Sequence, residues 1–361
     1  MSQINVKNLS NENEDGAPKI ESTPDFSATS YMVPPVGTTK QRPKNPQPGD
    51  LRFNTDTASL EYYKGDTLNW SRIEMTSPDL NGGARGIYGG GNSPSLVDTI
   101  EYITISTLGN PTDFGNLLAT TTGTCGTSSR TRGLFTGTST TNVIQYVTIS
   151  STGNAINFGD ASDAVGYRGG CSNDIRSVTN GGNPNSNVMD YSTFATLGDA
   201  LDFGDLTYSA STPISFASST RGIFAGGNSS PVINYITIAT TGNAATFGSL
   251  SLGTVNSEGC SNAIRGVAKL RGSSYINTID YITIATLGNS VDFGDALNNV
   301  GGCAAMASPT RAVFAGGYGT PAFSNIIQYV QIMTTGNALD FGDVSYDADS
   351  MAGFSNGHGG L

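Results

Sequence analysis

The chain has very little histidine and few basic residues. Its 361 residues include one histidine, His358, and 18 Lys plus Arg against 29 Asp plus Glu. A single histidine excludes a histidine-based catalytic triad and a multi-histidine metal centre. The formal net charge of −11, with no basic run, excludes a nucleic-acid partner, because phosphate binding needs clustered Lys and Arg.

Long apolar segments are missing as well. No stretch approaches the ~18 apolar residues of a membrane span, and the N-terminus has no apolar core of signal-peptide length. We therefore expect a soluble protein with neither membrane insertion nor a secretion signal. The cysteines lack C-x-x-C spacing and predict buried free thiols, with disulfide pairs or a metal site as the alternatives. They are Cys125, Cys171, Cys260 and Cys303.

What the chain does contain is a sixfold repeat marked by three residues. In every repeat a tyrosine precedes the phenylalanine of a Phe-Gly pair by 12 residues, and in the first five the arginine of the next repeat follows that phenylalanine by 18. The arginines are Arg85, Arg132, Arg176, Arg221, Arg265 and Arg311. The tyrosines are Tyr102, Tyr146, Tyr191, Tyr235, Tyr281 and Tyr329. The phenylalanines are Phe114, Phe158, Phe203, Phe247, Phe293 and Phe341.

Each repeat contains signals for four short strands. An apolar run after the arginine ends at Gly-Gly, and a β-branched and aromatic run surrounds the tyrosine. A turn and the Phe-Gly segment follow, and the residues before the next arginine supply one more strand. Four strands in about 45 residues match the size of a propeller blade.

The order of these signals resembles kelch repeats over roughly residues 80 to 361, although Phe-Gly stands where kelch usually has tryptophan. The resemblance implies an all-β fold, a six-bladed kelch-like β-propeller over residues 77–361. Repeats one, three and five carry an acid before the tyrosine, whereas repeats two, four and six carry Gln or Asn, so the duplicated unit is a pair of blades present three times. The acids are Glu101, Asp190 and Asp280.

The first repeat lacks the strand that precedes the arginine elsewhere. We expect residues of about 345–361 to provide this inner strand of blade one, which closes the ring. Both ends of the domain then lie on the face with the constant turns. The loops of variable sequence lie on the other face, at 93–98, 139–141, 183–187, 229–231, 273–278 and 318–325. A uniform scaffold with diverse loops predicts recognition, and drift without constraint is the alternative. The candidate ligand-binding residues are Tyr275, Tyr318, Phe323, Asn185 and Asn228.

Ahead of the repeats we expect an extended, proline-dotted arm at 1–45 and a small β module at 46–76. The run from Val36 to Trp70, with Gly-Thr-Thr, Gln-Arg-Pro, Arg-Phe-Asn-Thr-Asp-Thr and Leu-Glu-Tyr-Tyr, resembles a short module of tail-fibre and other virion proteins of tailed bacteriophages, notably those infecting marine cyanobacteria. The resemblance implies a virion component whose arm and module bind other virion proteins. The candidate anchoring residues are Pro34, Pro35, Arg52, Phe53, Tyr62, Tyr63 and Trp70.

Three functions remain open at this stage. The leading hypothesis is a non-enzymatic virion appendage, a tail fibre, neck or head fibre, whose variable face contacts a host glycan, a host protein or a partner protein. A purely structural spacer or decoration protein is the second, and a glycan-processing enzyme the third. We expect no cofactor, with calcium bound by aspartates and carbonyls as the alternative. The repeated arginines are expected to pair with Asp160, Asp205, Asp295 and Asp343, and the three blade pairs suggest association with a trimeric stalk.

Overall fold

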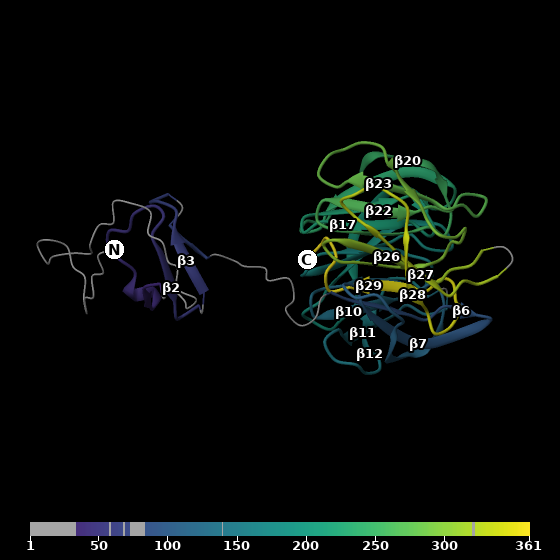
Figure 1. Ribbon diagram of the computed structural model, residues 1–361, viewed down its shortest axis with the longest axis horizontal. Coiled ribbons are helices and arrows are strands. Elements are labelled where there is room, and N and C mark those ends of the chain that lie inside the picture. Colours follow the sequence, from purple (N-terminus) through teal and green to yellow (C-terminus); the bar gives the residue numbers. More distant parts are fainter. Residues whose placement is uncertain (1–33, 58, 68, 73–83, 139, 320–321) are drawn as a thin grey trace, which may run out of the picture. The chain divides into compact units, whose positions relative to one another are not determined.

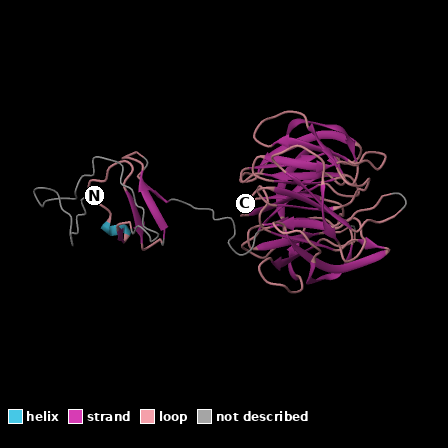
Figure 2. Cartoon of the chain, viewed as in Figure 1, coloured by secondary structure: helices cyan, strands magenta, loops and turns pink. Residues whose placement is uncertain are grey.

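The computed structural model describes residues 34–57, 59–67, 69–72, 84–138, 140–319 and 322–361. The chain divides into two compact units, residues 1–77 and 78–361 (Figure 1). Within the described residues there is no α-helix, only strands and one short 3-10 helix (Figure 2). None of the described elements is a helix long and apolar enough to cross a membrane.

The second unit consists of six antiparallel sheets, numbered here 1 to 6 in the order of their arginines. The inner strands of sheets 1 to 6 are β29 (Ala352–Ser355), β9 (Cys125–Ser128), β13 (Gly169–Ser172), β17 (Ile214–Ala217), β21 (Glu258–Ser261) and β25 (Ala304–Ala307). The second strands begin at the arginines and are β5 (Arg85–Gly89), β10 (Arg132–Thr136), β14 (Arg176–Asn180), β18 (Arg221–Ala225), β22 (Arg265–Lys269) and β26 (Arg311–Ala315).

The third strands carry the tyrosines and the outer strands the Phe-Gly pairs. The third strands are β7 (Ser95–Thr104), β11 (Val143–Thr148), β15 (Ser186–Thr193), β19 (Ser230–Thr237), β23 (Thr278–Thr283) and β27 (Ile326–Gln331). The outer strands are β8 (Thr112–Thr121), β12 (Ile156–Asp160), β16 (Leu201–Ala210), β20 (Ala245–Thr254), β24 (Val291–Asp295) and β28 (Leu339–Asp343). Sheet 1 has a fifth strand, the two-residue β6 (Asn92–Ser93), which pairs with β7.

The core of this unit lies between neighbouring sheets. The second strands are buried from their second residue onward, so both of their faces are covered. One apolar cluster, for example, joins Val267 of sheet 5 to Phe314 of sheet 6, and another joins Val178 of sheet 3 to Phe224 of sheet 4. Burial on two sides explains why strands such as β18 (Arg221–Ala225) and β26 (Arg311–Ala315) have continuous apolar runs after the arginine and do not alternate.

The C-terminal strand closes the set of sheets. β29 pairs antiparallel with β5, with Phe354 opposite Ile87. This confirms that the end of the chain supplies the inner strand of sheet 1, although the strand is shorter than the expected segment of about 345–361. Each inner strand contacts the inner strands of both neighbouring sheets, β29 lying between β25 and β9. Six sheets connected in this closed order are consistent with the blades of a β-propeller.

The first unit contains a small sheet in the order β1-β2-β3-β4. Its strands are β1 (Val36–Gly37), β2 (Leu51–Asn54), β3 (Ser59–Tyr63) and β4 (Trp70–Arg72), and the 3-10 helix η1 (Thr39–Gln41) follows β1. β1 pairs parallel with β2, so the sheet begins at Val36 and not at the residue-46 boundary expected from sequence. The end of the proline-dotted segment joins the sheet, because Phe53 N donates a hydrogen bond to Pro35 O at 2.8 Å. The part of the arm at 1–33 lies outside the described residues.

Candidate functional site

The second unit has two faces that differ in the kind of connection they carry. The turns from inner to second strand and from third to outer strand lie on one face, named here the constant face. The loops from second to third strand and the connections from outer to inner strand lie on the other, the variable face. Arg85 starts β5 and Ser355 ends β29 on the constant face, because β29 and β5 are antiparallel neighbours. The variable face therefore carries only internal loops of unit 2.

The six repeated arginines lie on the constant side and tie each sheet to the next. The guanidinium stacks on the tyrosine of its own sheet, with its carbon 4.3–4.8 Å from the ring centroid. It also donates to the carbonyl three residues beyond the tyrosine of the next sheet. Arg85 donates to Ile149 O at 2.7 Å, and Arg311 completes the circle by donating to Ile105 O at 2.8 Å.

These contacts correct the expected pairing of the arginines with aspartates. None of the described ion pairs joins a repeated arginine to Asp160, Asp205, Asp295 or Asp343. The planar guanidinium instead satisfies carbonyls left free where the third strand of the next sheet ends. The arginines therefore hold neighbouring sheets together.

The Phe-Gly segments and the third-to-outer turns form a second set of contacts between neighbouring sheets. In all six sheets an Asn or Asp side chain of the third-to-outer turn accepts, at 3.0 Å, the backbone N–H two residues beyond the phenylalanine of the preceding sheet. A Cβ on Gly248 would lie 2.1 Å from Gly288 O of the next sheet, so a side chain has no room there. Each phenylalanine meets the tyrosine of its own sheet edge-on, with centroids 5.9–6.2 Å apart.

The acids that alternate with Gln and Asn are buried links between sheets. Glu101 accepts hydrogen bonds from Tyr88 and from Ser345 of sheet 6. Asp190 accepts from Ser162 at 2.7 Å and pairs with the buried Arg168, whose Nη1 is 3.2 Å away. Gln145 plays the same part in sheet 2, accepting from Leu118 N at 2.8 Å. The two-sheet period therefore alternates charged and neutral hydrogen-bond acceptors at one structural position.

Three of the predicted ligand-binding residues form one aromatic cluster on the variable face. Tyr275, from the loop of sheet 5, meets Tyr318, from the loop of sheet 6, with ring centroids 5.8 Å apart. Tyr318 meets Phe323 at 5.1 Å. Arg271 stacks on Tyr275 at 4.4 Å and donates to its hydroxyl at 3.3 Å. All three aromatic side chains are half-buried, so each keeps some exposed surface, and Arg271 contacts the cluster through Tyr275.

Asn185 and Asn228 are exposed on the loops of sheets 3 and 4. No described contact joins either of them to the aromatic cluster, which belongs to sheets 5 and 6. Asn228 has a left-handed backbone with φ of 51°, a conformation that asparagine tolerates better than most residues. The structure therefore brings together the aromatic candidates and leaves the two asparagines apart.

Six further residues on the variable face were not predicted from the sequence. Each stands two residues before an inner strand, and all have left-handed backbones, with φ from 48° to 68°. They are Gly123, Tyr167, Thr212, Asn256, Gly302 and Ser350, named here the mouth ring. They surround a cavity of about 80 Å³ at the centre of the sheets, except that Gly302 is not part of its lining. Residue type does not repeat at this position, so only backbone geometry reveals it.

The cysteines, the acidic residues and the single histidine are the residue types in this chain that could bind a metal. The four cysteines are free and buried, as the sequence predicted, and burial raises the pKa of Cys125 and of Cys260 to about 12. Among the described residues no group of three or more His, Cys, Asp or Glu side chains lies together, so no cluster of acidic residues that could hold calcium is found there. Both ring nitrogens of His358 are hydrogen-bonded, Nε2 to Ser128 O at 2.9 Å and Nδ1 to Gly360 N at 3.1 Å.

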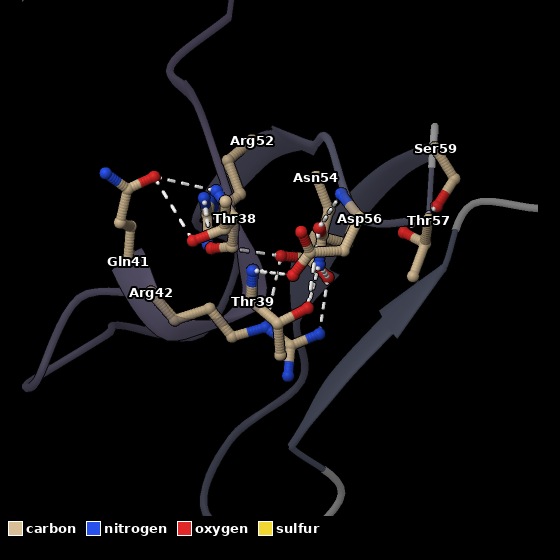
Figure 3. A network of polar contacts seen from close by, with 10 residues as sticks. Thr38, Thr39, Gln41, Arg42, Arg52, Asn54, Asp56, Thr57 and Ser59 are labelled. Carbon is tan, nitrogen blue, oxygen red and sulfur yellow. Dashed lines mark hydrogen bonds and ion pairs between the residues drawn. The ribbon is translucent and has the colours of Figure 1, made fainter.

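In the first unit the candidate anchoring residue Arg52 belongs to a network of polar contacts that includes Thr38 and Arg42 (Figure 3). Arg52 is only 4% exposed and donates to Thr38 O at 3.0 Å. It shares Glu61 with Arg42, whose Nη2 is 2.5 Å from Oε2, and this hydrogen bond holds the pKa of Glu61 below its usual range. The rings of Tyr63 and Trp70 are 5.5 Å apart.

The remaining candidate anchors are more accessible. Tyr62 and Phe53 are half-buried, Pro34 is half-buried and Pro35 is exposed. Lys64 lies over the ring of Tyr62 at 5.2 Å. Of the candidate anchors, only Arg52 and Tyr63 are therefore buried, whereas the others keep exposed surface, namely Trp70, Tyr62, Phe53, Pro34 and Pro35.

Comparison with known proteins adds no assignment. No protein-family model matches the chain, and a search of curated proteins finds no significant match.

Proposed function

We propose that the six sheets form a six-bladed, kelch-like β-propeller that serves a tailed bacteriophage as a non-enzymatic virion appendage, a tail fibre, neck or head fibre. Its variable face contacts the host surface, and the arm and small sheet bind other virion proteins. The chain is thus a part of the particle, assembled in the host cytoplasm.

One observation carries the recognition function. Every repeated landmark is occupied by contacts between sheets, whereas Tyr275, Tyr318 and Phe323 converge from two non-equivalent loops. Aromatic side chains dominate contact energies at recognition surfaces, and an arginine beside them adds a directional donor. Aromatic rings and Arg271 without an acid–base pair suit binding of a glycan or protein better than its hydrolysis.

The constant face is proposed as the attachment side. On sheets 1, 3 and 5 the third-to-outer turns expose a leucine, and Leu108, Leu197 and Leu287 are 58%, 58% and 59% exposed. The even sheets have Thr152, Thr241 and Thr335 at this position. Three equal apolar contacts around a six-sheet ring fit a threefold partner, so the proposal includes a trimeric stalk.

The test combines location and binding. Antibodies against residues 78–361 should label an appendage of the phage particle, and the purified chain should bind host cells and compete with phage adsorption. Replacing Tyr275, Tyr318 and Phe323 together by serine should abolish cell binding, while the matched change Leu197→Ser on the constant face should not. A chain that assembles into particles but neither binds cells nor competes would instead be a structural spacer.

A further inference from the structure

The mouth ring is held by a closed circle of hydrogen bonds. Going around the sheets, the backbone N–H of each residue donates to the carbonyl of the residue before it in five of the six links, at 2.6–3.1 Å. In the sixth link Asn256 N donates to Thr212 Oγ1 at 2.8 Å. The backbone of this ring is therefore fixed in the left-handed conformation at all six positions.

Glycine is the residue that adopts this conformation without strain, yet it occupies only Gly123 and Gly302. A β-branched or bulky residue there is a genuine outlier. Thr212 is explained, because its hydroxyl completes the hydrogen-bonded circle. Tyr167 is not explained in this way, because its N–H and carbonyl make the ring bonds and glycine would supply both.

The side chain of Tyr167 lies across the rim of the central cavity. A Cβ on Gly123 would be 3.1 Å from three carbons of the tyrosine ring, so the ring covers the Gly123 backbone. Its hydroxyl makes no hydrogen bond with any described residue, and the side chain is half-exposed. Residues with a strained backbone conformation concentrate at binding sites. The cavity below Tyr167 is therefore a candidate binding site.

The cavity below holds polar groups without partners. Thr124, 7% exposed, and Ser215 both line it, and their hydroxyl oxygens have no hydrogen-bond partner. Glu258 also lines it and makes no hydrogen bond with the described residues. Burial raises the pKa of Glu258 to about 8, so its carboxyl is neutral at pH 7 and both donates and accepts.

The backbone of the inner strands adds further donors and acceptors. Hydrogen-bonded and non-hydrogen-bonded residue pairs alternate along an antiparallel pair of strands. Ser129 N donates to Arg132 O, so the backbone groups of Ser128 and Gly126, one and three residues earlier, make no hydrogen bond with β10. Their N–H and carbonyl groups point away from β10. Those of Ser128 bond to Ser172 and His358, while Gly126 and its equivalents in the other sheets line the cavity.

The C-terminal residues cross the other end of this channel. His358 bonds to Ser128 of sheet 2, and Gly359 N donates at 2.7 Å to Ser261 O of sheet 5, on the opposite side of the ring. A lower chamber of about 60 Å³ lies between this crossing and the upper cavity. The upper cavity is therefore a well that a ligand enters from the variable face.

We propose that this well binds the end of a hydroxyl-rich chain, a terminal sugar whose ring stacks on Tyr167 while one substituent enters the cavity. Sugar hydroxyls both donate and accept, as the mixed lining requires, whereas an ammonium group only donates. The cavity volume of about 80 Å³ is several times the ~10–15 Å³ that one water needs, so the well has room for a polar substituent of a sugar. The inference rests on the variable face being the recognition face, but not on the aromatic cluster.

The experiment uses the full chain with free D-glucose, D-galactose, D-mannose and N-acetyl-D-glucosamine in saturation-transfer NMR and calorimetry. At least one sugar should bind, and Tyr167→Gly should weaken that binding at least tenfold. Because glycine suits the left-handed backbone, this change should leave the unfolding midpoint within about 2 °C of the natural protein. Ser229→Gly, at an exposed residue with φ of 60° outside the well, is the matched control and should bind as the natural chain does.

Two further variants test the interior of the well. Thr124→Val and Glu258→Leu should each weaken the same sugar severalfold, because each removes the hydrogen-bonding groups of the side chain while nearly keeping its volume. The proposal is overturned if none of the four sugars binds, if Tyr167→Gly binds equally well, or if its midpoint falls by more than 4 °C, which would give Tyr167 a packing role. Preference for methylammonium over every sugar would overturn the ligand class. Loss of cell binding in the aromatic-cluster variant with sugar binding intact separates the two sites.

Discussion

The arginine that begins each second strand shows how one residue can be repeated for packing alone. Arg221 stacks on Tyr235 at 4.8 Å and donates from Nη1 to Ile284 O at 2.8 Å and Ala285 O at 3.0 Å. A guanidinium can stack and donate at once because its donors lie in the plane of the group and its face stays free. The repeated arginines thus make contacts between neighbouring sheets, and these contacts account for their recurrence at the same position of every repeat.

Replacing Arg221 with alanine should lower the free energy of unfolding by about 1–3 kcal/mol, because two carbonyls lose a charged donor and Tyr235 loses its cation. Urea denaturation measures the effect. Arg130→Ala is the control, since Arg130 and Asp174 are 4.0 Å apart with side chains 45% and 54% exposed, and should change stability by no more than about 0.5 kcal/mol. An equal loss of unfolding free energy in the two variants would contradict the stabilising role of the Arg221 contacts.

At the scale of elements, β29 decides whether sheet 1 has an open edge. Without it, β5 would present unpaired backbone groups that pair readily with another chain. Phe354 anchors the strand, 4% exposed and 5.0 Å from Phe135 of sheet 2, and Gly133 makes room for it. The sequence predicted this strand because the first repeat lacks the strand that precedes the arginine in the other repeats.

Deleting residues 350–361 should therefore convert the monomer into dimers or aggregates and abolish cooperative unfolding. A synthetic peptide of residues 345–361, added in trans, should bind the truncated chain and restore the monomer. Size-exclusion chromatography and thermal unfolding report both effects. As a milder change, Phe354→Ala should cost about 3–5 kcal/mol. A truncated chain that stays monomeric with an unchanged unfolding midpoint would show that β29 does not close the ring.

At the scale of the whole molecule, the C-terminal crossing joins sheets that are far apart around the ring. His358 takes part as a neutral imidazole, because Gly360 N donates to Nδ1 and Nε2 donates to Ser128 O. Burial lowers the pKa of His358 to about 4 from its ordinary value of 6.5. The folded state thus favours the uncharged ring, and charging it would place a proton on the nitrogen that must accept from Gly360.

The stability gained from this neutral histidine is present above pH 6.5 and is lost as the pH falls from 6.5 to about 4. His358→Gln has no titrating group here, so its free energy of unfolding should fall less than that of the natural protein between pH 6.5 and 4. Urea denaturation of the two chains at pH 7, 5.5 and 4 measures the difference. The carboxylates of the protein change the free energy of unfolding with pH equally in both chains. Parallel pH profiles would contradict the assignment.

The sequence by itself determined the number of repeats, the strands within them and the source of the closing strand, because these depend on local periodicity and on spacing along the chain. It also identified Tyr275, Tyr318 and Phe323 as candidates, from aromatic residues in loops that differ between repeats. It placed the start of the small sheet too late, because the parallel pairing of β1 with β2 has no local signature. It also gave the arginines the wrong partners, since charge alone favours aspartate and only packing shows which carbonyls are left free.

Only the tertiary structure decided what lies at the centre of the ring. The six residues of the mouth ring include four residue types besides glycine, and the residues that flank them differ from repeat to repeat. No sequence pattern therefore predicts the mouth ring. Its shared left-handed backbone arises from hydrogen bonds between residues 44 or more positions apart, and those form only when all six sheets are in place. Such a ring cannot be predicted from the sequence, because the hydrogen bonds that form it join different sheets and leave no pattern within a repeat.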